Sequence, residues 1–283
     1  MNKISNEELN ILIDKANNGD KKALETVILS IQDLVFNLSF RMLGTKSDAE
    51  DASQDIILKI VTHLSTFKKQ SAFSTWVFSI ASNHLKNYKK HMFAKAQLSF
   101  DFYGNDIKNA NIENLPDMTN NVDKAILAEE LKFSCTNVML QCLDSDSRCI
   151  FILGTMFKIN SQIASEILGI SSDSYRQKLS RARKKMAQFL SEYCGEYGNG
   201  KCMCKDRINY AIMSHRLNPH QLDYTTSSEI SLEKILDVTN AMENIDHYSE
   251  EFSFCKTYKS PEIIKKFIKD LLNSIDIDII KNS

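Results

Sequence analysis

Forty residues in the first half of the chain, from Val61 to Phe100, combine lysines and aromatic rings without any carboxylate. The whole protein, by contrast, has 283 residues and a formal net charge of −1. Lysines that neutralise phosphates, interleaved with rings on which bases stack, are what single-stranded nucleic acid requires. The alternative is an aromatic-rich core helix with a solvated lysine face, and composition alone leaves both interpretations open. The tract contains Lys68, Lys69, Lys86, Lys89, Lys90 and Lys95, with Phe67, Phe73, Trp76, Phe78, Tyr88, Phe93 and Phe100.

A second basic segment, from Ser161 to Leu190, has the pattern of a helix-turn-helix. Gly169 can take the positive φ of the turn, and Ser171 or Ser172 can cap the second helix. That helix has six bases against the single Asp173, a balance of +5, whereas an ordinary surface helix usually pairs both signs of charge. Its expected buried face consists of Tyr175, Leu179, Ala182, Met186 and Phe189.

The opposite face of this second helix carries the side chains that suit duplex DNA. Arginine and glutamine can bond bidentately to base edges, and flanking lysines suit phosphates. We therefore expect the helix to contact duplex DNA through Arg176, Gln177, Lys178, Ser180, Arg181, Arg183 and Lys184.

Cysteines follow the basic helix in a C-x7-C-x-C arrangement. Three thiolates supply three of the four ligands of a tetrahedral zinc site, so a structural or sensory zinc fits this pattern, although no cofactor is required by it. Free thiols or a reversible disulfide fit it equally. The three cysteines are Cys194, Cys202 and Cys204, and a fourth ligand would come from His215, His220 or Cys255. The remaining Cys135, Cys142 and Cys149 are expected to be small apolar core residues.

The elements that must position these side chains are predicted to be helices. Only eight Gly and three Pro occur, which disfavours folds with many tight turns. Capping boxes at Ser5–Glu8 and Ser47–Glu50 predict two helix starts. Asp20 is expected to open a long helix that ends at Gly44. Ser71 is expected to cap a helix that runs through Trp76 toward Lys90.

The predicted fold class is all-α, with two helical domains, a polar linker and a small, mostly helical C-terminal extension. The first domain covers residues 1–96, and the Asn- and Asp-rich linker covers 97–121. The second domain covers 122–193 and contains the helix-turn-helix, and the Cys-containing extension covers 194–283.

Composition and motifs exclude several classes of protein. The first residues are polar and no apolar run approaches the length of a membrane span, so we expect a cytoplasmic protein without membrane insertion. Seven cysteines without an export signal indicate thiols or metal ligands in a reducing compartment. There is no Gly-rich phosphate loop, nucleophile motif or His-x-x-x-His pair, so we expect no enzyme activity.

Three segments in order, SDAEDASQDIILKIVTHL, FKKQSAFSTWVFSIASNHLKNYKK and the SRAR-containing helix, resemble bacterial RNA polymerase sigma factors of the extracytoplasmic-function group. The resemblance covers roughly residues 15–190. It implies a non-catalytic subunit that binds core RNA polymerase, at the clamp helices of the largest subunit and at the flap region, and that recognises and locally melts promoter DNA. The alternative is a helix-turn-helix regulator that binds duplex DNA without polymerase; this would need only residues 122–193 and leaves the acid-free tract unexplained.

The resemblance also implies roles for single residues. Asp51, Gln54 and Asp55 match the surface that docks on the clamp helices, and the loop from Thr66 to Phe73 is similar to the loop that holds an extruded base of the minus-ten element. Trp76, the only tryptophan, could stack on a base, but the family's pattern favours a core position for it. Minus-ten contacts are thus expected from Lys68, Lys69, Ser71, Phe73, Asn83, Lys86, Asn87, Lys89 and Lys90.

The basic helix corresponds to the family's minus-thirty-five contacts, with matches at Arg176, Gln177, Ser180 and Arg181. Tyr175 stands where a smaller aliphatic residue is usual, and Lys90 replaces a frequent arginine, which puts the promoter sequence in doubt. The CGEYGNGKCMC and YKSPEIIKKFIKDLL segments resemble an extension found on some of these factors, where it is thought to regulate the factor in cis.

Overall fold

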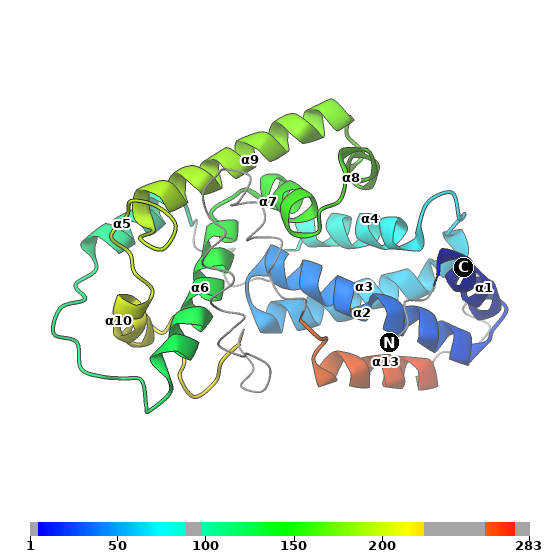
Figure 1. Cartoon of the computed structure of the whole chain (residues 1–283). Coiled ribbons are helices and arrows are strands. Elements are labelled where there is room, and N and C mark those ends of the chain that lie inside the picture. Colours follow the sequence, from blue (N-terminus) through cyan, green and yellow to red (C-terminus); the bar gives the residue numbers. More distant parts are fainter. Residues whose placement is uncertain (1–4, 89–97, 224–257, 275–283) are drawn as a thin grey trace. The chain divides into compact units, whose positions relative to one another are not determined.

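The computed structural model describes residues 5–88, 98–223 and 258–274. Regular structure in these ranges is helical, apart from one isolated β-bridge between Cys194 and Cys202, which confirms the all-α prediction (Figure 1). The chain forms two compact units. The first contains residues 1–94, 159–175 and 256–283, and the second contains 95–158 and 176–255. Each unit thus combines segments that the sequence analysis assigned to different domains, and the domain boundaries stay predictions.

The first unit is organised around one long apolar helix, α2, which contacts α1, α3, α4 and α13. Asp20 accepts hydrogen bonds from the backbone N–H groups of Lys22 and Ala23 and so caps α2. Gly44 ends it with a φ of 81°, a value that favours glycine. The helices of this unit are α1 (Asn6–Asn17), α2 (Lys21–Leu43), α3 (Lys46–Thr62), the 3-10 turn Leu64–Thr66, α4 (Phe73–Lys86), α8 (Ser161–Leu168), the start of α9 (Ser172–Tyr193) and α13 (Glu262–Ser274).

By length and composition alone, α2 is also the one helix among the described residues that could cross a membrane. Core helices of globular proteins pass the same test, and 61% of its apolar window is buried inside the structure. Its apolar character is therefore explained by packing.

Two of the predicted helix starts are wrong. The cap of α3 is Thr45, whose hydroxyl accepts from the Asp48 N–H, so the capping pair lies two residues before the predicted Ser47–Glu50 pair. The cap of α4 is Ala72 without a side-chain bond, and Ser71 does not cap it. In both cases several small polar residues precede the helix, and propensity does not decide which of them adopts the extended cap conformation. The Ser5–Glu8 capping box is confirmed.

The helix-turn-helix is confirmed at its predicted place. Asn160 caps α8, and Gly169 ends it in the left-handed region with a φ of 65°. Ser171 accepts a hydrogen bond from the Ser174 N–H at 3.2 Å and so caps α9. Tyr175 is only 1% exposed, as its inward placement predicted.

The second unit contains a helix that the sequence analysis did not predict. Residues 100–109 were assigned to the linker, but they form α5 (Phe100–Asn109), with Ser99 as its cap. The Tyr103 ring stacks on Phe189 with centroids 5.3 Å apart. Gly104 lies against the Tyr193 side chain, where a Cβ atom would be 2.3 Å from Cζ, so any larger residue would displace the Tyr193 ring. The other helices of this unit are α6 (Lys124–Gln141), α7 (Ser145–Phe151) with a π-helical turn over Ile152–Met156, most of α9, the 3-10 turn Lys205–Arg207 and α10 (Ile208–Met213).

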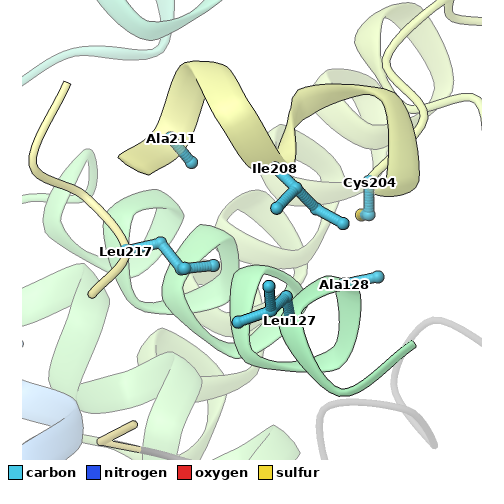
Figure 2. Packing of buried hydrophobic residues seen from close by; sticks show 6 residues of the cluster. All are labelled: Leu127, Ala128, Cys204, Ile208, Ala211 and Leu217. Atoms are coloured by element: carbon cyan, nitrogen blue, oxygen red, sulfur yellow. The ribbon is translucent and has the colours of Figure 1, made fainter. Parts of the chain in front are cut away.

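A small apolar core joins the segment after α9 to α6 within this unit. Figure 2 shows Cys204, Ile208 and Leu217 lying against Leu127 and Ala128 of α6. Cys204 is 8% exposed and acts as a small apolar side chain there. Residues 204–217 therefore contribute Cys204, Ile208, Ala211 and Leu217 to this unit's core.

Candidate nucleic-acid interface

The first unit has an open groove of about 700 Å³ between α3 and α4. It joins the predicted polymerase-docking surface to the acid-free tract, because Asp55 lines it from α3, Asn83 lines it from α4 and Asn87 lines it from the C-cap of α4. The complete lining is Asp55, Lys59, His63, Thr66, Trp76, Ile80, Asn83, His84, Asn87 and Tyr88.

His84 lies at the wall of this groove between a cation and an anion. Its Nδ1 lies 2.8 Å from Lys59 Nζ, and its Nε2 lies 3.8 Å from Asp55 Oδ2. Partial burial and the Lys59 charge lower the pKa of His84, and the Asp55 carboxylate opposes them. His84 Nε2 and the Tyr88 hydroxyl are both buried and make no hydrogen bond within the described residues.

The lowered pKa of His84 predicts a pH dependence of stability. The unfolded chain binds a proton more readily than the folded one, so stability rises with pH across this titration. The contribution of His84 to the free energy of unfolding is complete above its ordinary pKa of 6.5. It is lost as the pH falls through the lower pKa that His84 has in the folded protein. We expect urea unfolding between about pH 5 and pH 8 to show a steeper loss of stability on acidification for the parent than for His84→Gln. Equal slopes for the two proteins would contradict this assignment.

An aromatic cluster supports Trp76, one of the residues that line the groove. Trp76 stacks on Phe73 with centroids 5.6 Å apart and lies 5.6 Å from Phe67. Trp76 was expected in the core, but it is half-buried and lines the groove, so part of its ring is available for stacking. Phe73, which was expected to contact DNA, is 2% exposed. In this structure Phe73 supports Trp76, and its own ring has no accessible face.

The remaining predicted contacts of the first unit differ in their surroundings. Asp51 is exposed on α3, and Gln54 is half-buried. Lys68 and Lys69 are exposed on the loop before α4, where Lys69 has a positive φ of 58° and forms an ion pair with Asp14 of α1. Ser71 and Lys86 are half-buried, and Lys89 and Lys90 lie outside the described residues.

The second candidate interface is the exposed face of α9. Six of the seven predicted side chains are exposed along it: Arg176, Gln177, Lys178, Ser180, Arg181 and Lys184. Arg183 is the exception, because it is half-buried, and its contact with DNA stays a prediction. Its guanidinium donates to Thr155 Oγ1 at 3.0 Å and to the Gly154 carbonyl at 3.1 Å, both in the π-helical turn after α7. These bonds turn Arg183 toward its own unit, where it holds α9.

The cysteine junction is not assembled as a metal centre within the described ranges. There, no three His, Cys, Asp or Glu side chains are grouped so that they could hold a metal ion. Cys194 and Cys202 are paired through their backbones, while Cys204 lies in the apolar core. Burial raises the pKa of all three thiols, which disfavours the thiolates that zinc needs. Cys255 lies outside the described residues, and the zinc hypothesis stays a prediction.

Several groove residues were missed by the sequence analysis. Ile80 and His84 share one face of α4 with Trp76, Asn83 and Asn87 at spacings of three and four, and this period was available in the sequence. Lys59 and His63 could not be found in this way, because their approach to α4 depends on how α3 packs against it.

Comparison with known proteins identifies the family. Residues 27–91 match the family model of sigma-70 region 2, which includes α3, α4 and the groove between them. This match and the similarity to sigma factors support a sigma-70 family sigma factor. The similar proteins include factors of the extracytoplasmic-function group.

Three relatives illustrate the likeness. The RNA polymerase sigma-H factor of Pseudomonas aeruginosa is 24% identical over 188 residues, which cover 63% of this chain and 92% of the relative. The ECF RNA polymerase sigma factor SigW of Bacillus subtilis is 22% identical over 189 residues, or 64% and 95% of the two chains. The ECF RNA polymerase sigma-E factor of Escherichia coli is 25% identical over 174 residues, or 62% and 90%.

Proposed function

We propose that this protein is a cytoplasmic, non-catalytic subunit that binds core RNA polymerase and directs it to promoters. The main support is the groove, in which Asp55, a predicted polymerase contact, and Asn83 and Asn87, predicted minus-ten contacts, line one surface. The groove includes residues of the segment that matches sigma-70 region 2, and eight of its ten lining residues come from the tract without carboxylates. A regulator that binds duplex DNA alone would not need this surface.

In the proposed mechanism, polymerase docks on α3, at Asp51, Gln54 and Asp55 and through the clamp helices of its largest subunit, and contacts the second unit through its flap region. The exposed face of α9 then positions duplex DNA at the minus-thirty-five element by phosphate and base contacts. Lys68 and Lys69 provide charge for the minus-ten backbone beside the groove.

The groove would then stabilise a melted strand. Extruding a base costs a few kcal/mol, and stacking on a protein ring returns about 1–3 kcal/mol. Trp76 is the lining ring that we assign to this stacking, and Asn83 and Asn87 provide amide donors and acceptors. Since the two energies nearly balance, melting would depend on promoter sequence.

The test is transcription in vitro with the purified full chain and core polymerase on a library of genomic promoters. We expect co-elution of the chain with core polymerase and transcripts that start at a restricted set of promoters. Specific duplex binding by the chain alone, without co-elution, would favour the regulator instead.

We also propose that residues 194–283 regulate the factor in cis. A truncation after Tyr193 tests this proposal. Unchanged promoter activity and unchanged DNA affinity of the truncated protein would reject it.

A further inference from the structure

The end of the chain returns to the first unit, where residues 258–274 pack on α2 and α3. This segment is separated from its partner Asn37 by 221 residues of sequence. In Figure 1, α13 runs along the side of α2 and α3 that is opposite to α4.

Two polar side chains of α2 recognise the backbone of this segment. Asn37 is fully buried, donates to the Tyr258 carbonyl at 2.7 Å and accepts from the Tyr258 N–H at 2.9 Å. One turn earlier, Asp33 accepts from the Ser260 N–H at 2.8 Å and from the Ser260 hydroxyl at 2.5 Å. A buried amide that binds both backbone groups of one distant residue would lose these partners without that segment, which is costly. This face of α2 is therefore built to hold an extended peptide.

Apolar contacts continue the docking along α13. The Tyr258 ring meets Phe40 edge-on with centroids 5.4 Å apart. Ile264, Ile268 and Leu272 recur at intervals of four and are at most 8% exposed. The same helix leaves Ile263 50% exposed, so only one face is used.

The docked segment leaves the candidate polymerase surface open. Asp51 and Asp55 on α3 are exposed with α13 in place, and the groove lies on the α4 side of α3. We propose that residues 258–274 are a built-in support of the first unit, held by Asp33, Asn37 and Phe40, and that they are required for polymerase binding rather than acting as its inhibitor. The polymerase part of this inference rests on the proposed function.

A pair of matched substitutions in the full chain tests this. Ile268→Asp places a charge at a site that is 2% exposed, whereas Ile263→Asp makes the same kind of change on the exposed face. We expect Ile268→Asp to abolish hydrogen-exchange protection in α13, to raise exchange in α2 and to weaken binding to core polymerase by about tenfold or more. Ile263→Asp should match the parent in all three measurements.

Adding a synthetic peptide of residues 256–283 to Ile268→Asp separates undocking from general misfolding. We expect the peptide to restore protection of α2 and polymerase affinity. Unchanged protection in Ile268→Asp, no rescue by the peptide, or undocking with equal or tighter polymerase binding would each overturn the proposal. If the parent itself fails to bind polymerase, the proposed function is rejected. Hydrogen exchange in α2 of Ile268→Asp, measured with and without the peptide, then still decides whether the docking site exists.

Discussion

Replacing Gln177 and Arg181 together by alanine is expected to weaken binding of the protein to duplex minus-thirty-five DNA by about 30-fold or more. The two residues are four apart on α9, so they share one exposed face near its N-terminal half. Each bidentate contact between such a side chain and a base contributes about 1–3 kcal/mol of discrimination. The measurement is fluorescence anisotropy with a promoter duplex and a scrambled duplex at one fixed salt concentration.

Control variants on the same helix sharpen this test. Gln188→Ala changes an exposed amide about two turns further along α9 and should leave affinity unchanged. Lys184→Ala should weaken binding to both duplexes alike and reduce the salt dependence by about one counterion, as a phosphate contact does. Equal loss on promoter and scrambled duplexes for the double variant would show that this face does not read bases.

Replacing Asn83 by alanine is expected to reduce promoter-specific transcription by about tenfold or more while polymerase binding persists. Asn83 is exposed and lines the groove from α4, where its side-chain amide can bond to an unpaired base. Loss of such a contact costs about 1–3 kcal/mol. The measurement pairs abortive transcription on the cognate promoter with the affinity of the variant for core polymerase.

On the α3 wall of the groove, Asp55→Ala is expected to have the opposite effects to Asn83→Ala. It should weaken the affinity for core polymerase. When the variant is added at a saturating concentration, promoter selectivity should be retained. Asn105→Ala, an exposed asparagine of α5 in the second unit, should behave as the parent in both assays. Transcription by Asn83→Ala at the parent's level would reject the assignment of this groove to the minus-ten element.

The sequence predicted the parts of the fold that local chemistry determines. The left-handed turn at Gly169, the cap at Ser171 and the buried Tyr175 all follow from helix geometry, and all are found. Helix α5 was missed because its Asn and Asp residues have low helix propensity, while its stability comes from Tyr103 stacking on Phe189, a residue far along the chain.

The residues of the candidate sites were likewise predictable only where the local helix pattern determines their position. The helical period of the sequence predicted the exposed face of α9. The inward orientation of Arg183 depends on its hydrogen bonds to the π-helical turn after α7, and no local sequence pattern predicts that turn. The composition of the acid-free tract indicated a nucleic-acid surface without separating Trp76, which lines the groove, from Phe73, which is buried beneath it. Packing between helices decides which of these two rings lines the groove and which is buried.

The most direct test of the proposed function compares intact and opened promoter DNA. The full chain and core polymerase would be titrated with a promoter duplex and with the same promoter carrying a mismatched, unpaired minus-ten element. We expect clearly tighter binding to the opened form, a preference that is absent with core polymerase alone and reduced by Asn83→Ala. Equal affinity of the complete assembly for both forms would contradict the claim that this groove holds an unpaired strand.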